Sequence, residues 1–267
     1  MAIGGAEDKI QDRLILRTFV KLAGGQQAKI LLIPMASETP EIKGQIYGGL
    51  FADLGAESTQ VLLVGDRAGG ESADLIQQLE DCTGVFISGG DQSRLCGFLG
   101  STPFAEQLRQ RVYQGRIVLA GTSAGAAVLG HHMITGGGSG EAPNHGLVDL
   151  ETGFGILPGA IVDQHFHNRN RLARLMSAIA PHPHAIGIGI DEDTCALVNG
   201  QGQIQVLGKG VVTILQSTQL WSKDGSLPAN PLPLSLPNLQ LHLIGHGEVY
   251  DAVNINSDGL PASRWLD

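Results

Sequence analysis

Short, continuously apolar runs alternate with amphipathic segments over the first two-thirds of the chain. Four runs have the composition of strands that are covered on both faces, as in a parallel sheet: residues 30–34, 61–64, 84–88 and 117–120. Helical spacing of apolar positions occurs at residues 10–23, 39–54, 72–80 and 104–113. Strands and helices therefore alternate with short loops, which predicts a doubly wound α/β fold around a mostly parallel sheet.

Local signals mark the ends of the first two helices. The first runs into Gly24 and Gly25, and glycine is the residue that most often follows a helix. Thr39 and Pro40 suit the N-cap and the first position of the second helix. The apolar positions of that helix predict one buried face, formed by Ile42, Ile46, Leu50 and Leu54.

The pattern is looser after Ile134. We expect a glycine-rich loop at 136–146, followed by a strand at 160–166, a helix at 169–180 and a strand at 185–190. A β-hairpin at 204–215, a proline-rich connection at 228–237 and a last strand at 239–244 are expected to follow. No internal repeat and no domain linker is visible. Residues 1–267 are therefore expected to form a single domain with a C-terminal β-hairpin extension.

Composition and charge exclude several classes of protein. The net charge is −9 and no run of Lys or Arg occurs, so we expect no nucleic-acid partner. No apolar run approaches the roughly 18 residues of a membrane span, and the N-terminus lacks the features of a signal peptide. The three cysteines show no CxxC spacing, which is typical of small thiols in a reducing cytoplasm.

A G-x-S-x-G motif at residues 121–125 directly follows one of the apolar strands. A strand-to-helix turn of this kind needs small residues, and it would expose Ser123 at the carboxyl edge of the sheet as a nucleophile. The chain contains 38 glycines, so the match alone has little specificity. The alternative is a tight turn in which the serine only caps a helix.

A second glycine turn, at residues 88–92, ends another apolar strand. The backbone N–H groups of Gly90 and Ala124 are candidates for an oxyanion hole facing the carbonyl group that Ser123 attacks. The alternative is an ordinary turn with Asp91 as the helix N-cap.

His165 is the candidate base, because it ends an apolar strand and precedes a loop at the same sheet edge. Glu192 follows another apolar strand and would hold the imidazole in the required tautomer. Two alternatives are open: the acidic residues around Glu192 cap a turn, or His165 and His167 bind a metal. The metal alternative has no further ligand at a suitable spacing.

Three arginines follow the candidate base, at Arg169, Arg171 and Arg174. Arginine binds carboxylates in a bidentate manner, so this cluster suits a carboxylate-rich substrate. The alternative is a solvated helix face. Neither a G-x-G-x-x-G nor a Walker motif is present, and we expect no cofactor.

Five segments together resemble the peptidase family that contains cyanophycinase and the aspartyl dipeptidases. They are GGAEDK at 4–9, GGDQSRL at 89–95, GTSAGAA at 121–127, DQHFHNRNRLARL at 163–175 and GIGIDEDT at 187–194. The resemblance covers about residues 4–215 and is nearer to the cyanophycinase branch. It implies a class I glutamine-amidotransferase-like (flavodoxin-like) fold and a homodimer. Two departures are a short first strand, with only Met1–Ile3 before GGAEDK, and Ala173 where glycine is expected.

The resemblance also implies a function and its residues. It implies a serine exopeptidase that forms an acyl-enzyme and cleaves cyanophycin, a poly-aspartate with arginine on each β-carboxylate, to β-Asp-Arg dipeptides. Ser123, His165 and Glu192 would be the catalytic residues. Around the substrate it places Gln92, Asp163, Gln164, Arg169, Arg171 and Arg174. The alternatives are an aspartyl or isoaspartyl dipeptidase and a member of the superfamily without catalytic activity.

Overall fold

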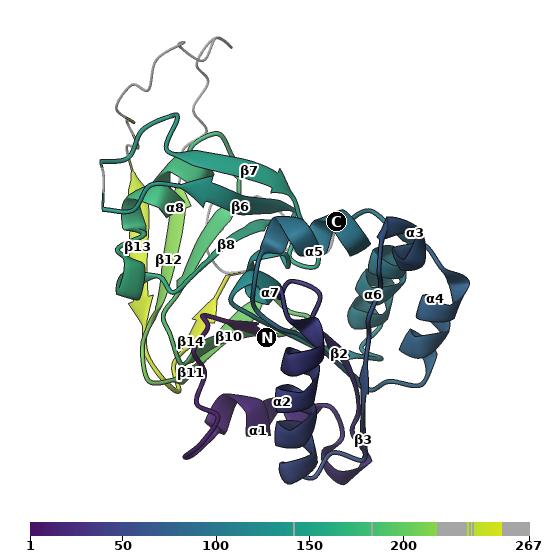
Figure 1. The fold of residues 1–267 in the computed structure, drawn as a ribbon. Helices are drawn as coiled ribbons and strands as arrows, with labels where there is room; N and C mark the ends of the chain where they lie inside the picture. Colours follow the sequence, from purple (N-terminus) through teal and green to yellow (C-terminus); the bar gives the residue numbers. More distant parts are fainter. Residues whose placement is uncertain (141, 183, 218–233, 235, 237, 253–267) are drawn as a thin grey trace.

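The computed structural model describes residues 1–140, 142–182, 184–217, 234, 236 and 238–252 (Figure 1). Within them the main sheet has eight strands in the order β14-β11-β10-β1-β5-β4-β2-β3. Their bounds, in that order, are Val249–Asp251, Gln203–Gly208, Thr194–Val198, Ala2–Ile3, Val118–Thr122, Gly84–Ile87, Lys29–Ile33 and Ser58–Val61. The five strands from β1 to β3 are parallel, and β10, β11 and β14 are antiparallel to their neighbours. The predicted α/β class with a mostly parallel sheet is confirmed.

Helices cover both faces of this sheet because its central strands are almost entirely apolar. Ile30 and Leu32 pack with α1 and α2 on one face, while Leu31 and Ile33 pack with α4, α5 and α6 on the other. The helices are α1 (Leu14–Leu22), α2 (Pro40–Asp53), α3 (Arg67–Gly70), α4 (Ala73–Glu80), α5 (Gln92–Leu99), α6 (Pro103–Tyr113), α7 (Ala124–Ala127) and α8 (Leu172–Ile179). Short 3₁₀ helices lie at Gly25–Gln27 and His167–Arg169.

A second sheet lies beside the first (Figure 1). Its order is β13-β12-β9-β8, with bounds Leu239–Ile244, Val212–Ser217, Ile186–Ile190 and Ala160–Gln164. Helix α8 packs against it through Leu175 and Ile179, which share a buried cluster with Ile161 and Leu215. A hairpin pairs β6 (His132–Gly137) with β7 (Val148–Thr152), and most of the expected glycine-rich loop, 136–146, lies between these two strands.

The hairpin expected within residues 204–215 does not form. Strand β11 pairs with β10 and β14 in the main sheet, whereas β12 pairs with β9 and β13 in the second sheet. Gly208, with φ of +118°, lies where the chain leaves the main sheet. Two strands that are adjacent in sequence thus connect the two sheets instead of pairing with each other.

The predicted buried face of α2 is wrong in its first half, whereas Leu50 and Leu54 are half-buried and pack against the core. Ile42 and Ile46 are 54% and 46% exposed, and the buried residues of the helix are Gly44, Tyr47 and Phe51. The aromatic rings of Tyr47 and Phe51 pack against Phe86 of β4 with centroid distances of 4.9 and 5.2 Å. Aromatic side chains bury the largest area, so they determined which side of the helix faces the sheet.

The first strand and the first helix both start close to sequence expectation. Strand β1 has only two residues, as expected from the short segment before GGAEDK. Helix α1 begins at Leu14 and not at Ile10, because the carboxylate of Asp8 accepts hydrogen bonds from the backbone N–H groups of residues 10–13 and holds them in a turn.

No helix in the described ranges is long and apolar enough to span a membrane. The proline-rich connection at 228–237 lies almost entirely outside the described residues.

Candidate active site

Ser123 lies in the sharp turn between β5 and α7. Its φ and ψ are 54° and −115°, a conformation that is unfavourable for any residue except glycine. The turn is compact: a Cβ on Gly121 would lie 2.0 Å from the carbonyl oxygen of Gly125, and a Cβ on Gly125 would lie 2.3 Å from that of Ile87. The two glycines of the motif are therefore required by close backbone approach, and the serine projects from the carboxyl end of β5.

Ser123, His165 and Glu192 form a continuous chain of hydrogen bonds. The distance from Ser123 Oγ to His165 Nε2 is 2.9 Å, and that from His165 Nδ1 to Glu192 Oε1 is 2.6 Å. A carboxylate only accepts, so Nδ1 carries the proton and Nε2 accepts from the serine hydroxyl. The Glu192 backbone N–H donates to Asn168 Oδ1 at 3.0 Å, which anchors the loop that carries the acid.

Parallel strands bring the last two members of this set together. Strands β8 and β9 pair in parallel, with Gln164 opposite Ile190, so the segments that follow them leave the sheet at the same edge. His165 comes directly after β8 and has a φ of 51°. Like Ser123, it is held in a left-handed conformation at the site.

The pKa of His165 is lowered from its usual value. Burial is the largest cause, the hydrogen bond to Glu192 acts in the opposite direction, and the positive charges of Arg169 and Arg171 lower the pKa further. The imidazole is thereby kept neutral at neutral pH. A neutral imidazole with a free Nε2 lone pair is the form that a general base needs.

The segment at residues 3–5 joins the three parts of the site. Each of its carbonyl oxygens accepts a hydrogen bond from a backbone N–H group in a different segment of the site. The oxygen of Ile3 accepts from Ser123 at 3.0 Å, that of Gly4 from His165 at 2.8 Å and that of Gly5 from Asp193 at 2.9 Å. Gly5 has φ of +96°, and a Cβ there would lie 2.5 Å from His165 Nε2. The glycines of GGAEDK thus let the chain pass against the imidazole ring, a role that the sequence did not reveal.

Glu7 was also missed by sequence reasoning. Its side chain is buried; Oε2 accepts from the Thr122 hydroxyl and Oε1 from the Tyr47 hydroxyl, both at 2.5 Å. The ammonium group of Lys9 lies 2.8 Å from Oε1. Burial and the charge of Glu7 raise the pKa of Tyr47 well above its usual value, so the phenol remains a donor. The only sequence signal was an acidic residue within GGAEDK.

The glycine turn after β4 approaches Ser123 closely. A Cβ on Gly89 would lie 3.0 Å from the Cβ of Ser123, and a Cβ on Gly90 would lie 2.1 Å from the carbonyl oxygen of Ala36. Within the described ranges, the backbone N–H groups of Gly90 and Ala124 donate no hydrogen bond. Both groups are therefore available to a substrate oxygen. Asp91 is the N-cap of α5, which the alternative interpretation of this glycine turn predicted.

Four of the predicted substrate residues bind mainly one another. Arg174 forms a bidentate pair with Asp163, with Nε 2.9 Å from Oδ2. Arg171 Nη1 lies 2.9 Å from Gln164 Oε1 and 3.3 Å from Asp163 Oδ1. All four side chains are buried. Burial lowers the pKa of Arg171 to about 10, with Asp163 opposing the shift, so the guanidinium stays charged at neutral pH.

The other two predicted substrate residues stand apart from this buried cluster. Arg169 is exposed in the 3₁₀ helix after β8. Gln92 begins α5, and its amide donates to the carbonyl oxygen of Ile134 at 2.7 Å. Arg169 is therefore the member of the arginine group whose guanidinium is open to solvent.

A cavity of about 660 Å³ opens on Ser123 and His165. Its walls come from the GGAEDK segment, the start of α2 and the glycine turn after β4. Its volume is within the roughly 300–1,000 Å³ of ligand sites. The side chains that line it are Ala6, Glu7, Lys9, Ala36, Ser37, Glu38, Thr39, Lys43, Tyr47, Asp91, Thr122, Ser123 and His165, with Gly89 and Gly90. None of the six predicted substrate residues is among these lining residues.

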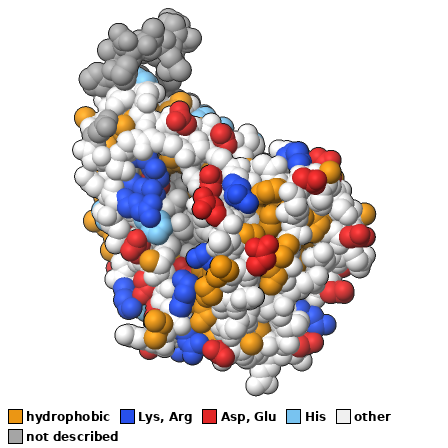
Figure 2. All heavy atoms as spheres, viewed as in Figure 1, with side chains coloured by type: hydrophobic (Ala, Val, Ile, Leu, Met, Phe, Trp, Pro, Cys, Tyr) orange, Lys and Arg blue, Asp and Glu red, His pale blue; other side chains and the backbone are white. Residues whose placement is uncertain are grey.

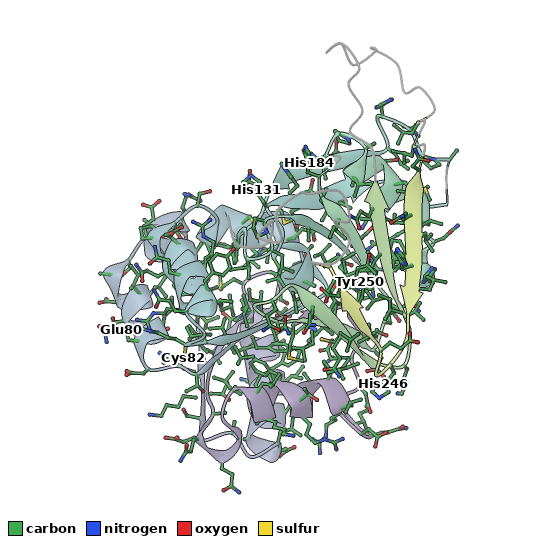
Figure 3. The ribbon with its side chains drawn as sticks, turned by 180° about the vertical axis from the view of Figure 1, so that it is seen from behind. Glu80, Cys82, His131, His184, His246 and Tyr250 are labelled. Atoms are coloured by element: carbon green, nitrogen blue, oxygen red, sulfur yellow. The ribbon has the colours of Figure 1, made fainter. Side chains whose placement is uncertain are left out.

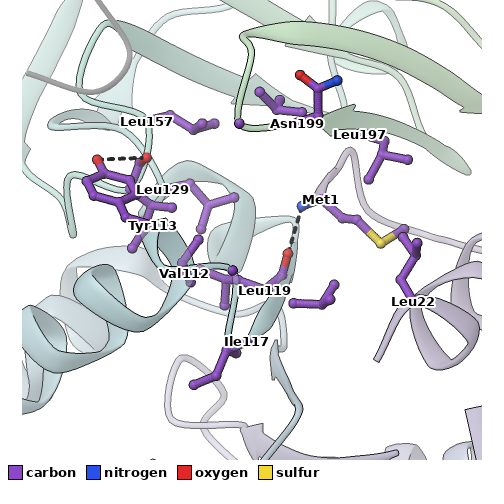
Figure 4. Close-up of a pocket in the computed structure, with 15 residues that line it drawn as sticks. Met1, Leu22, Val112, Tyr113, Ile117, Leu119, Leu129, Leu157, Leu197 and Asn199 are labelled. Atoms are coloured by element: carbon purple, nitrogen blue, oxygen red, sulfur yellow. Dashed lines mark hydrogen bonds between the residues drawn. The ribbon is translucent and has the colours of Figure 1, made fainter. Parts of the chain in front are cut away.

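A second cavity, of about 420 Å³, lies beside Met1 and the first residues of β5 (Figure 4). Its lining is largely apolar. The Met1 ammonium group donates to the carbonyl oxygen of Leu119 at 2.7 Å, and burial lowers the pKa of this ammonium group. The cavity is at the opposite end of β5 from Ser123, whereas α/β proteins bind ligands at the carboxyl ends of their strands.

The described residues contain no group of three or more His, Cys, Asp or Glu side chains placed to hold a metal ion. His167 Nδ1 instead lies 2.9 Å from Asp191 Oδ1. Figure 3 shows His131 and His246 well apart from one another, and His246 accepts a hydrogen bond from the backbone N–H of Gly208.

The profile of peptidase family S51 matches residues 1–206. The chain belongs to peptidase family S51. The predicted family resemblance and the predicted class of serine-type peptidase are thereby confirmed.

Several S51 relatives are similar over most of their length. A protein named cyanophycinase from Geminocystis herdmanii is 52% identical over 252 residues, which cover 94% of this chain and 92% of the relative. One from Nostoc sp. (strain PCC 7120) is 54% identical over 249 residues, which cover 93% of this chain and 83% of the relative. A solved peptidase from an acI-B1 Actinobacterium has a TM-score of 0.67, is 24% identical and covers 93% of this chain and 94% of its own, which supports the fold.

Proposed function

We propose that this S51 peptidase is a serine exopeptidase that hydrolyses cyanophycin to β-Asp-Arg dipeptides through an acyl-enzyme. The observation that carries the proposal is the hydrogen-bonded chain from Ser123 Oγ through His165 to Glu192. The choice of substrate is supported by identities of 52–54% to proteins named cyanophycinase.

In the first half of the reaction, the Ser123 hydroxyl attacks the carbonyl carbon of an aspartate–aspartate peptide bond. His165 Nε2 takes the serine proton as the new ester bond forms. The C–N bond then breaks, and His165 returns the proton to the leaving amine. Glu192 holds Nδ1–H and stabilises the imidazolium between these two transfers.

In the second half, a water molecule attacks the ester carbonyl and His165 accepts its proton. The Ser123–acyl bond breaks, the serine oxygen regains a proton from His165, and the carboxylate product leaves. The backbone N–H groups of Gly90 and Ala124 hold the oxyanion in both halves, and one such donor contributes about 3 kcal/mol in the transition state.

The arginine-rich side of the site supplies substrate binding. Arg169 is exposed and its charge reaches His165, so we assign it to a carboxylate of the substrate. Gln92 supplies an amide oxygen for a substrate guanidinium, whereas the amide oxygen of Gln164 accepts from Arg171. Asp163 and Arg174 are bound to each other, so they act by holding Arg171 and Gln164 in position.

Purified protein incubated with cyanophycin tests the proposal, with products identified by mass spectrometry. The expected product is β-Asp-Arg, and a panel of α- and β-aspartyl dipeptides is expected to be cleaved far more slowly. Ser123→Ala is expected to remain folded and lose turnover, whereas Ser58→Ala, at the far edge strand β3, keeps it. Unchanged turnover in Ser123→Ala excludes the serine mechanism, and preference for the dipeptides excludes cyanophycin as the substrate.

We further propose a cytoplasmic homodimer. The three cysteines are free thiols, which suits a reducing compartment. Leu241 and Leu243 of β13 are 43% and 58% exposed, and apolar groups of this kind favour a partner surface. Light scattering on the purified protein measures the mass, and a mass of one chain contradicts the dimer.

A further inference from the structure

The cavity beside Ser123 has an inner wall whose polar groups are already satisfied. Lys9 is neutralised by Glu7 at 2.8 Å and lies 5.3 Å from the centre of the Tyr47 ring. The two oxygens of Glu7 accept hydroxyl protons from Thr122 and Tyr47. This wall therefore supports the nucleophile turn and leaves no charge for a ligand.

The outer wall differs, because two of its charged side chains form no ion pair within the described ranges. One of them is Lys43, which lies in the first turns of α2 and lines the cavity. Glu38 lies in the loop before α2, is exposed and likewise has no ion pair in this part of the chain. Asp91 lines the cavity and uses Oδ1 to cap α5. One ammonium group and two carboxylates thus border the same cavity as the nucleophile.

A cavity that contains both the nucleophile and the base must receive a part of the substrate that is joined directly to the scissile bond. The arginine-rich side does not line this cavity, so the substrate has a second binding region here. Figure 2 shows acidic and basic side chains interspersed over the face that carries α2 in Figure 1, without one dominant sign. A uniformly anionic or cationic ligand would therefore be poorly matched.

We propose that Lys43 and Glu38, with Asp91, form a second subsite that binds a zwitterionic unit next to the scissile bond. Lys43 binds a carboxylate, and the carboxylates of Glu38 and Asp91 bind a guanidinium. In the proposed function, on which this inference rests, each β-Asp-Arg unit carries one group of each kind. The subsite therefore holds one of the two units that the scissile aspartate–aspartate bond joins.

The test compares Glu38→Gln and Lys43→Met with the wild type on a synthetic substrate of two β-Asp-Arg units. Both variants are expected to raise KM about three- to fivefold, the range for partly exposed charge pairs, with kcat unchanged. The increase is expected to diminish at high salt because such pairs are screened. The matched controls are Glu41→Gln, on α2 but outside the cavity lining, and Lys21→Met on α1, and both are expected to behave as wild type.

Combining a protein variant with an altered substrate distinguishes a lost contact with the substrate from a general change in the protein. One arginine of the two-unit substrate is replaced by citrulline, which has the same shape without the charge. We expect the replacement to raise KM for the wild type at either unit, and to raise it less for Glu38→Gln at the unit that occupies the subsite, where Asp91 is then the remaining carboxylate. If the effects of Glu38→Gln and of the citrulline replacement on KM are additive at both units, the subsite is overturned. A KM within twofold of wild type for both variants overturns it as well. In either case the proposed function stands. A wild type that cleaves no two-unit substrate overturns the proposed function as well.

Discussion

Replacement of Gly5 by alanine tests whether the N-terminal segment positions His165, the proposed base. Gly5 has φ of +96°, and an added Cβ would lie 2.4 Å from His165 Cε1 and 2.5 Å from Nε2. Contacts below 3.0 Å cannot persist, so the imidazole has to move by several tenths of an ångström or more. A misplacement of about 1 Å can reduce a rate by about 100-fold, and we expect kcat to fall by about ten- to a hundredfold.

Gly55→Ala provides the matched control, because Gly55 has φ of +85° and an added Cβ meets nothing within 4 Å. Both variants carry the same backbone cost, about 1–2 kcal/mol for an L-residue in this region. Thermal unfolding should therefore show a loss in Tm of a few degrees in both variants, with a larger loss in Gly5→Ala because of the overlap with His165. Steady-state kinetics should show a loss of kcat in Gly5→Ala alone. Equal kcat values in the two variants, measured on folded protein, refute a positioning role for Gly5.

Two further predictions concern titration and the buried ion cluster. The pKa of His165 is lowered and its neutral form is the base in the proposed mechanism, so kcat/KM should rise with pH through an acidic limb whose midpoint lies below 6.5; a midpoint above 6.5 in the pH–rate profile contradicts the assignment. Asp163→Asn leaves the buried guanidinium groups of Arg171 and Arg174 without their carboxylate, and should lower the free energy of unfolding by about 3–5 kcal/mol in urea titrations. A loss below about 1 kcal/mol would show that the cluster is not held by this charge.

Sequence patterns were informative wherever a residue's environment depends on its near neighbours. Continuous apolar runs identified β2, β4 and β5, because a strand covered on both faces has no polar positions. The glycine spacing around Ser123 identified the turn, because the close contacts of Gly121 and Gly125 are with residues at the same strand ends. Ser123, His165 and Glu192 were named in advance, and the structure brings these three side chains into contact.

Contacts between segments far apart in the chain decided which face of α2 is buried and how residues 204–215 pair. The buried face of α2 depends on Phe86, a residue of β4, so the spacing of Ile42 and Ile46 was misleading. Residues 204–215 have the pattern of a hairpin, but each half finds a better partner in a different sheet.

The sequence by itself determined the α/β class and the chemistry that the site offers. It could not show that Asp163 and Arg174 pair in the interior, or that Gly5 lies against the ring of His165. Only the tertiary structure decided these roles, because a side chain's charge and shape are local properties whereas its burial and its partners depend on how distant segments pack.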